Sequence, residues 1–139
     1  MRITLESDYA LRIISEIATR KECVCAKTIS DSTSVTQKFT LKILRKLVKG
    51  GYVKSFKGAS GGYGLAVAAD KITLKEIIEL IDGPIMILKC LESSEGCSLN
   101  RDKASCVYHH IFDEISLDVA KKLARITISD VVNKRIGEP

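Results

Sequence analysis

The 139-residue chain is 45% hydrophobic and 28% charged, a composition that can bury a core and that excludes intrinsic disorder. Its apolar runs are all shorter than the roughly 20 residues of a membrane-spanning helix, and an acid precedes the first of them, unlike in a signal peptide. The formal net charge is +5. We therefore expect a cytoplasmic protein with one compact domain, or one domain with an appendage.

The positive charge is concentrated in one segment. No acidic residue occurs between Asp31 and Asp70, and the rest of the chain is mildly acidic. The cations of this segment are Lys38, Lys42, Arg45, Lys46, Lys49, Lys54 and Lys57. They form either a solvated helix face or a surface that binds the phosphates of a polyanion. The fold of the segment decides between these interpretations.

The first half of the chain has a helical pattern. Residues 8–19 carry pairs of apolar residues every four positions, which predicts a helix with one buried stripe, and residues 26–32 predict a short second helix. After a turn at 32–34, Thr36 is a candidate N-cap for a helix over 37–49 that ends at Gly50 and Gly51. The residues predicted to form its buried face are Phe39, Ile43, Leu44, Leu47 and Val48. A short helix, a tight turn and a second helix with a basic face are typical of a helix-turn-helix.

A β-hairpin is predicted directly after this unit. Residues 52–56 alternate as a strand, residues 57–62 form a glycine-rich turn, and residues 63–68 form the return strand. A hairpin in this position is a wing.

The next helix has clear end signals. Thr73 and Glu76 have the spacing of a capping box, and residues 82–84 (Asp-Gly-Pro) end the helix. Residues 85–105 show no steady period, which predicts a loop.

A longer helix is predicted from about Cys106 to about Arg125. Its apolar face is wide for a helix that leaves a small domain, which indicates packing against another chain. Thr127 is a candidate cap for a last short helix that runs through Val131. The predicted fold class is mainly α with a small β-hairpin wing: a winged helix-turn-helix and a long C-terminal dimerisation helix.

The strongest chemical motif is Cys90-x6-Cys97-x8-Cys106-x2-His109. In a cytosolic protein these thiols are expected to be reduced or metal-bound, and clustered thiolates are good ligands for soft or borderline metals. The alternative is a set of ordinary small buried residues. It suits Cys106 but suits Cys90 and Cys97 poorly, because they lie among polar residues. The spacing differs from that of zinc fingers and ferredoxins, so it does not name the metal.

Four segments of the sequence resemble the IscR/NsrR group of winged-helix regulators, the Rrf-two family. They are spread from one end of the chain to the other, so the resemblance extends over essentially the whole chain, and the wing signature with three loop cysteines is specific. The segments are Met1–Thr4 with Asp8–Arg12, Leu44–Val53 followed by the pattern Gly58-x-x-Gly61-Gly62-Tyr63-x-Leu65, Ile72–Ile78, and Ile126–Val132.

The resemblance implies a homodimer that binds a palindromic operator. It also implies a [2Fe–2S] or [4Fe–4S] cluster that is held by Cys90, Cys97 and Cys106 and modulates DNA binding. His109, next to His110, matches the fourth ligand of the IscR type. Asp8 matches that of the NsrR type, which is donated by the first helix of the other subunit. Both are present, so the choice stays open, and Asp8 also suits an ordinary first-turn acid that the helix dipole favours.

The sequence departs from the family pattern at several points. The cysteine spacings are longer than in IscR-like relatives. Leu41 stands where IscR-type members carry a DNA-facing glutamate, so their operator sequence is not carried over. Cys23 and Cys25 have no counterpart among the family's ligands, and we interpret them as adventitious thiols.

Candidate DNA contacts lie first at the start of the third helix. Thr36, Gln37 and Lys38 would contact base edges or phosphates, because recognition helices bind bases with their N-terminal residues. Gln37 can pair with adenine and Lys38 with guanine. Lys42 and Thr28 are expected to contact phosphates.

The wing supplies the other candidate contacts. Lys57, Ser60 and the flexible pair Gly61 and Gly62 would enter the minor groove or follow the DNA backbone. Tyr63 is expected to belong to the core.

We therefore expect a regulator, and a repressor in particular, rather than an enzyme. Residues 1–84 would bind DNA, residues 85–106 would hold the cluster, and residues 107–139 would dimerise. The signal would be cluster supply, nitric oxide or redox state. The alternatives are a regulator resembling CymR, without a cluster and controlled by a protein partner or thiol chemistry, and structural zinc in the same loop. A nucleotide-binding loop at residues 58–64 is disfavoured because a strand, not a helix, follows its glycines.

Overall fold

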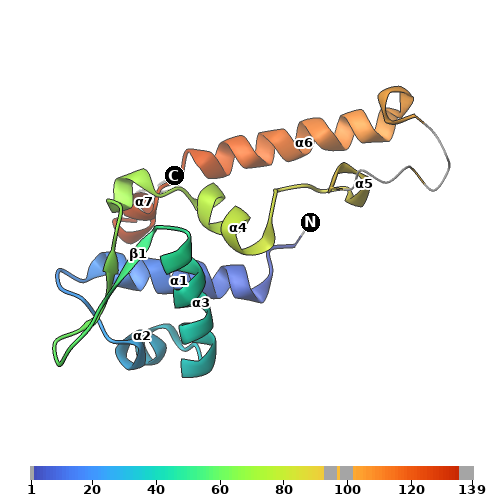
Figure 1. Ribbon diagram of the computed structural model, residues 1–139. Helices are drawn as coiled ribbons and strands as arrows, with labels where there is room; N and C mark the ends of the chain where they lie inside the picture. The colour runs from blue at the N-terminus through green and yellow to red at the C-terminus, as the bar shows by residue number, and fades with distance from the viewer. Residues whose placement is uncertain (1, 93–96, 98–101, 135–139) are drawn as a thin grey trace.

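The computed structural model describes residues 2–92, 97 and 102–134. The chain forms a helical body with a two-stranded wing and a long helical arm (Figure 1). Its elements in chain order are α1 (Leu5–Thr19), α2 (Ala26–Thr33), α3 (Gln37–Lys49), β1 (Val53–Phe56), β2 (Gly62–Leu65), the 3₁₀ turn η1 (Ala69–Lys71), α4 (Leu74–Asp82), α5 (Lys89–Glu92), the 3₁₀ turn η2 (Lys103–Ser105), α6 (Val107–Ala124) and α7 (Ile128–Val132).

The helix-turn-helix is formed by α2 and α3, and local signals fix both ends of α3. The Thr36 hydroxyl accepts a hydrogen bond from the backbone N–H of Phe39 (3.3 Å), which satisfies one of the unpaired amides at the helix start. At the other end Gly51 has φ +83°, a conformation that residues with a Cβ rarely adopt. The predicted bounds of this helix, 37–49, are confirmed.

The wing is held against the start of α2 by a close backbone contact. Val24 and Tyr63 exchange two backbone hydrogen bonds (3.0 and 2.8 Å) in an isolated β-bridge. A Cβ on Gly62 would lie only 2.5 Å from the Val24 carbonyl oxygen, so glycine is required there. The hairpin pairs Ser55 with Tyr63, and its strands are shorter than the predicted segments.

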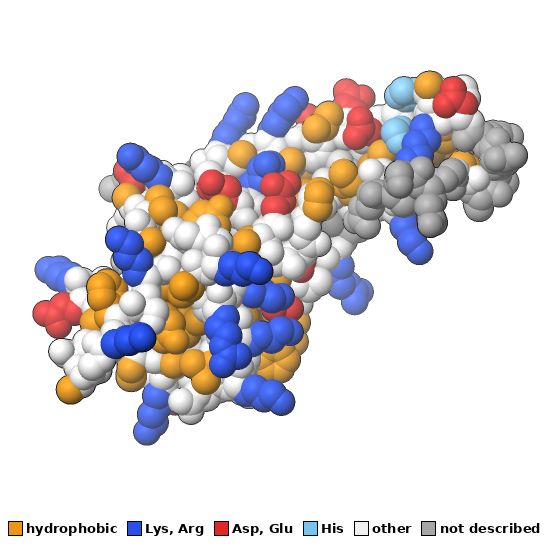
Figure 2. All heavy atoms as spheres, viewed as in Figure 1, with side chains coloured by type: hydrophobic (Ala, Val, Ile, Leu, Met, Phe, Trp, Pro, Cys, Tyr) orange, Lys and Arg blue, Asp and Glu red, His pale blue; other side chains and the backbone are white. Residues whose placement is uncertain are grey.

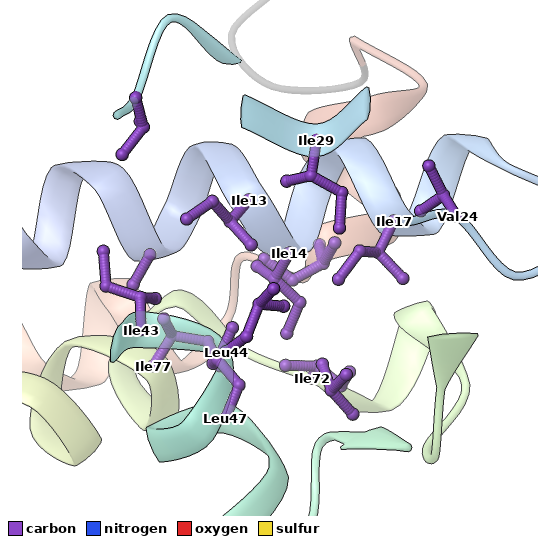
Figure 3. Packing of buried hydrophobic residues seen from close by; sticks show 14 residues of the cluster. Ile13, Ile14, Ile17, Val24, Ile29, Ile43, Leu44, Leu47, Ile72 and Ile77 are labelled. Carbon is purple, nitrogen blue, oxygen red and sulfur yellow. The ribbon is translucent and has the colours of Figure 1, made fainter. Parts of the chain in front are cut away.

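The core lies between α1 and the helices on either side of it (Figure 3). Ile13 and Ile14 of α1 are fully buried, and burial of one such side chain stabilises the fold by about 1.5–3 kcal/mol. Ile29 of α2 lies on one side of them, and on the other lie Ile43, Leu44, Leu47, Ile72 and Ile77. This core fixes α3 against α1, so the remaining face of α3 is left for solvent.

Two matching helix starts bring the end of the chain back to the body. The predicted capping box of Thr73 and Glu76 is present, and Thr127 forms a second one with Asp130. The backbones of these two starts are joined directly, because Leu74 N–H donates to the Ile126 carbonyl (2.9 Å). The helix α7 therefore packs beside α1. The chain leaves the body after α4, and α6 leads back to it (Figure 1).

The helix α6 forms an arm that runs along α4 and extends beyond it (Figure 1). Its 18 residues span about 27 Å. The Ser116 hydroxyl, buried on this arm, accepts from the N–H of Ile87 (3.0 Å) and donates to the Phe112 carbonyl (2.6 Å), which anchors the incoming segment. No helix within the described residues has both the length and the apolar character needed to cross a membrane.

The prediction of a loop over 85–105 was wrong in two places, where α5 and η2 form. Such short helices contain about one turn, which is too short to produce a hydrophobic period. The Asp102 side chain accepts from the N–H of Ala104 (3.2 Å) and caps η2. Residues 93–96 and 98–101 of this predicted loop lie outside the described residues.

One carboxylate joins the start of α1 to the end of α4. Asp82 accepts hydrogen bonds from the backbone N–H (3.2 Å) and the hydroxyl of Thr4. Partial burial alone would raise the Asp82 pKa, but these bonds outweigh it and lower the pKa below its usual value. The contact therefore stabilises the fold more strongly when Asp82 is ionised than when it is protonated.

We expect Asp82→Ala to lower the free energy of unfolding by about 1 kcal/mol at neutral pH, an effect that solvent exposure keeps small. A carboxyl whose pKa is lower in the folded state stabilises the fold at pH values above its unfolded pKa. That stabilisation is lost as the pH falls through the folded-state pKa. Urea unfolding at acidic and neutral pH should therefore show that the free energies of unfolding of the wild type and of Asp82→Ala converge in acid. Asp70→Ala, at an exposed carboxylate of η1, is the control. A constant difference at every pH would contradict this role for Asp82.

Candidate DNA-binding surface and cysteine segment

A stripe of cations lies along the exposed face of α3. Its members recur every three or four residues, so they share one side of the helix, and all four are exposed. They are Lys38, Lys42, Arg45 and Lys49. Lysine and arginine side chains gather over this part of the body in Figure 2. The second helix of the helix-turn-helix thus presents positive charge outward, as a phosphate-binding surface requires.

Glu6 of α1 neutralises part of this charge. Its carboxylate pairs with the ammonium of Lys46 (2.6 Å) and lies 3.6 Å from that of Lys42. Lys42 also lies over the ring of Phe39, 5.8 Å from its centroid. Lys42, a predicted phosphate contact, is therefore already oriented by two neighbours, but its side chain remains 55% exposed.

The predicted contacts at the start of α3 are all exposed. Thr36, Gln37 and Lys38 lie at its N-terminal end, where a recognition helix meets base edges. The Thr36 hydroxyl is also the helix cap. Thr28, on α2, is half-buried, and its hydroxyl shares a hydrogen bond with the Cys25 thiol (3.1 Å).

The predicted wing contacts lie together at the hairpin tip. Lys57 and Ser60 are exposed, whereas Gly61 and Gly62 are half-buried. A Cβ on Gly61 would lie 2.3 Å from the Phe56 carbonyl oxygen, so this glycine is also required by the fold. The Cys23 thiol donates to the Ser60 carbonyl (3.0 Å) and ties the tip to the segment before α2. The two glycines therefore shape the wing, whatever they contact.

Sequence patterning missed an aromatic pair beside the stripe. Phe39 and Val48 were predicted to be buried, which is wrong: they are 43% and 37% exposed. Phe39 instead meets the ring of Tyr9 edge-on (centroids 6.1 Å apart), and the Arg12 guanidinium lies over the Tyr9 ring, 5.4 Å from its centroid. An apolar residue at the margin of an amphipathic helix cannot be assigned to the core without its neighbours, and Tyr9 is remote in sequence.

The three predicted metal-binding cysteines lie on the excursion between α4 and α6. Cys90 is in α5, Cys97 follows it, and Cys106 is the N-cap residue of α6. All three are half-buried free thiols. Three thiols on one excursion are a suitable donor set for iron or zinc. No three cysteine, histidine, aspartate or glutamate side chains among the described residues are gathered in a metal-binding arrangement.

The candidate fourth ligands lie on different elements. His109 is in the first turn of α6, half-buried, with its ring 6.0 Å from that of His110. His110 Nε2 hydrogen-bonds with the Ala104 carbonyl (2.7 Å). Asp8 is in the first turn of α1, where its carboxylate pairs with Arg12 (2.6 Å). The assignment of either residue as a ligand stays a prediction.

Cys25 stands apart from these thiols. It is the exposed N-cap residue of α2, and hydrogen bonding with Thr28 lowers the pKa of its thiol below the usual value. Neither Cys23 nor Cys25 lies in the excursion that carries the other three cysteines.

A helix-turn-helix with a basic second helix, followed directly by a two-stranded wing, defines a winged helix-turn-helix protein. Residues 3–134 match the family model Rrf2, described as an iron-dependent transcriptional regulator. The chain belongs to the Rrf2 family of transcriptional regulators. It is therefore a DNA-binding regulator rather than an enzyme.

Individual relatives agree with this assignment. The chain is 30% identical to an HTH-type transcriptional regulator of Haemophilus influenzae, covering 97% of this chain and 89% of that protein. It is 27% identical to the regulator NsrR of Bacillus licheniformis, covering 95% and 92%. It is 28% identical to the regulator IscR of Erwinia tasmaniensis, covering 97% and 81%.

Two solved structures have the same fold. One is CymR, the global cysteine regulator of B. subtilis, with a TM-score of 0.79, 25% identity, and coverage of 96% of this chain and 98% of that one. The other is IscR of T. potens, with a TM-score of 0.76, 20% identity, and coverage of 97% and 88%. The predicted fold class, a winged helix-turn-helix with a long C-terminal helix, is confirmed.

Proposed function

We propose that this regulator is a homodimeric, cytoplasmic repressor whose operator binding is controlled by an iron–sulfur cluster. The observation that carries the proposal is the placement of three free thiols on one excursion, which joins the DNA-binding body to an arm with an apolar face. Residues 1–84 bind DNA, residues 85–106 hold the cluster, and residues 107–139 dimerise.

The DNA-binding part of the proposal rests on the exposed start of α3. Thr36, Gln37 and Lys38 enter the major groove and meet base edges, and Lys42 and Thr28 contact phosphates. In the wing, Lys57 and Ser60 approach the minor groove or the backbone. Two such units in a dimer would bind the two halves of a palindromic operator.

The dimer part rests on the apolar face of α6. Three of its residues repeat at i, i+3 and i+7, so they form one stripe, and all are exposed in the single chain: Tyr108, Ile111 and Ile115. Hydrophobic side chains are visible along this arm in Figure 2. A soluble protein rarely leaves such a stripe in water, and a second copy of α6 is the occupant that two-fold symmetry supplies.

The cluster part rests on donor chemistry. Cys90, Cys97 and Cys106 would be the thiolate ligands of a [2Fe–2S] or [4Fe–4S] cluster, with Asp8 of the other subunit or His109 as the fourth. The family description of iron dependence and the relatives named IscR and NsrR support it. Such a cluster supplies irons and sulfides that react directly with nitric oxide or oxidants, or that are lost when supply fails.

A second candidate is a CymR-like regulator without a cluster, which is controlled by a protein partner or thiol chemistry. The similarity to CymR over nearly the whole of both chains favours it. The same three cysteines with His109 would also suit structural zinc.

Metal analysis separates these candidates. We expect anaerobically purified protein to contain iron and acid-labile sulfide, with the visible charge-transfer absorption of a cluster. Iron and sulfide should leave together on exposure to an oxidant, and operator binding should change with them. Zinc alone, or no metal after anaerobic reconstitution, would contradict the cluster and leave DNA binding by the winged helix intact.

A further inference from the structure

One carboxylate of α1 lies behind the cations of α3. Glu6, in the first turn of α1, accepts a hydrogen bond from the Lys46 ammonium at Oε1 (2.6 Å), and its Oε2 lies 3.6 Å from the Lys42 ammonium. The Glu6 side chain is only 23% exposed, whereas that of Lys42 is 55% exposed. The carboxylate therefore approaches Lys42 from the body of the protein and leaves most of the lysine open to solvent.

The outer side of Lys42 faces a hollow on the exposed face of α3. The hollow has a volume of about 400 Å³ and is lined by Lys38, Phe39, Lys42 and Arg45, so Glu6 is not part of its lining. The Lys42 ammonium also lies over the ring of Phe39. A phosphate can therefore reach Lys42 from the hollow while Glu6 stays in place on the other side.

Glu6 distinguishes two cations of α3 from the rest. Within the described residues it is the only carboxylate that forms an ion pair with a cation of α3. Its pair with Lys46 joins α1 to α3, which is a structural role. Its second oxygen acts on Lys42, a proposed phosphate contact, so the same carboxylate also influences the DNA-binding surface.

We propose that Glu6 sets the DNA affinity: it competes with phosphates for Lys42 and keeps binding weaker than the cations of α3 alone would give. The inference rests on the proposed contact between Lys42 and a phosphate. A phosphate in contact with the Lys42 ammonium would lie about 6 Å from the Glu6 carboxylate, and two unit charges at that distance lower the affinity about threefold in water. Because this contribution is independent of sequence, Glu6 also weakens binding to the unrelated DNA that competes with the operator.

Glu6→Gln in the full-length protein tests this role, because the amide keeps the size of the side chain and removes its charge. The probes are duplexes that the wild type selects from a random pool and one unrelated duplex. We expect the variant to bind both about three- to tenfold more tightly at low salt. The slope of log K against log [salt] should become steeper by up to about one.

The matched control is Glu79→Gln, which removes the carboxylate that pairs with Lys75 on α4 (3.0 Å). It makes the same change of charge away from α3 and should bind both duplexes with the affinity and the slope of the wild type. Circular dichroism and urea unfolding would confirm that both variants are folded.

A double-mutant cycle with Lys42 assigns the effect. We expect Lys42→Gln to weaken binding and to reduce the slope by about one, and Glu6→Gln to add little in that background. The inference is wrong if Lys42→Gln has this effect but Glu6→Gln alone leaves the affinity unchanged or lowers it, because Glu6 would then only hold or orient the lysines. An undiminished gain in the Lys42→Gln background would also contradict competition at Lys42. If Lys42→Gln itself leaves the slope unchanged, the proposed phosphate contact fails and the inference falls with it.

Discussion

Replacing Cys97 with alanine is expected to remove iron and sulfide from anaerobically purified protein and to change its operator affinity. Cys97 is the central cysteine of the excursion, and its half-buried thiol is not part of a disulfide. Loss of one of three thiolates leaves too few soft ligands to hold a cluster, because the other candidates are single oxygen or nitrogen donors. Visible absorption with iron and sulfide analysis measures the first effect, and fluorescence anisotropy on selected duplex DNA measures the second.

The matched control is Cys25→Ala, which removes a thiol at the start of α2 and outside the excursion. We expect it to retain the wild-type iron and sulfide content. Cluster-controlled binding would be refuted if the Cys97 variant bound the operator with the same affinity as the wild-type protein that carries its cluster. Equal loss of iron from both variants would instead implicate the thiols before α2 as ligands.

The parts of the fold that the sequence predicted are those with local signals. Thr36 and Gly50-Gly51 mark the ends of α3, and Thr73 with Glu76 marks the start of α4. In each case the determining contact joins residues only a few positions apart. The start of α1 was placed three residues late because Thr4, its N-cap, precedes the first strong apolar pair.

Features that depend on distant residues were not predictable in this way. Phe39 is exposed and contacts Tyr9 of α1, and the charge of Lys46 is neutralised by Glu6, 40 positions away. The cation stripe was visible in the sequence, but its division into paired and unpaired members was not. Arg45 and Lys49 acquire a shared groove only when the wing folds beside them.

The candidate metal site shows the same limit. The spacing of Cys90, Cys97 and Cys106 suggested ligands, yet spacing cannot say how the 17 residues from Cys90 to Cys106 close around an ion. Cys90 lies in α5 whereas Cys106 lies between η2 and α6, and Asp8 is already paired with Arg12. For Asp8 to become a ligand, its carboxylate would have to separate from Arg12. Within the described residues, His109 would not have to break an ion pair.

The second large effect is expected at the α6 stripe, where Ile115→Glu should convert the proposed dimer to monomers. Ile115 is 41% exposed in the single chain and lies in line with Tyr108 and Ile111, so a carboxylate there would be buried without a partner when two arms meet. A monomer binds only one half-site. Operator affinity should then fall roughly 10²–10⁴-fold, the gain that linking two binding units provides. Sedimentation velocity and anisotropy measure the two effects.

Leu117→Glu is the matched control for this prediction. It makes a comparable change from an apolar residue to glutamate on the same helix, but the helical period places Leu117 on the side opposite the stripe, where it is 52% exposed. We expect this variant to remain dimeric and to bind the operator as the wild type does. If it dissociates while Ile115→Glu stays dimeric, the arms meet through the other face of α6. If neither substitution changes the mass of a wild-type dimer, α6 is not the interface, and the stripe must be covered by something other than a second copy.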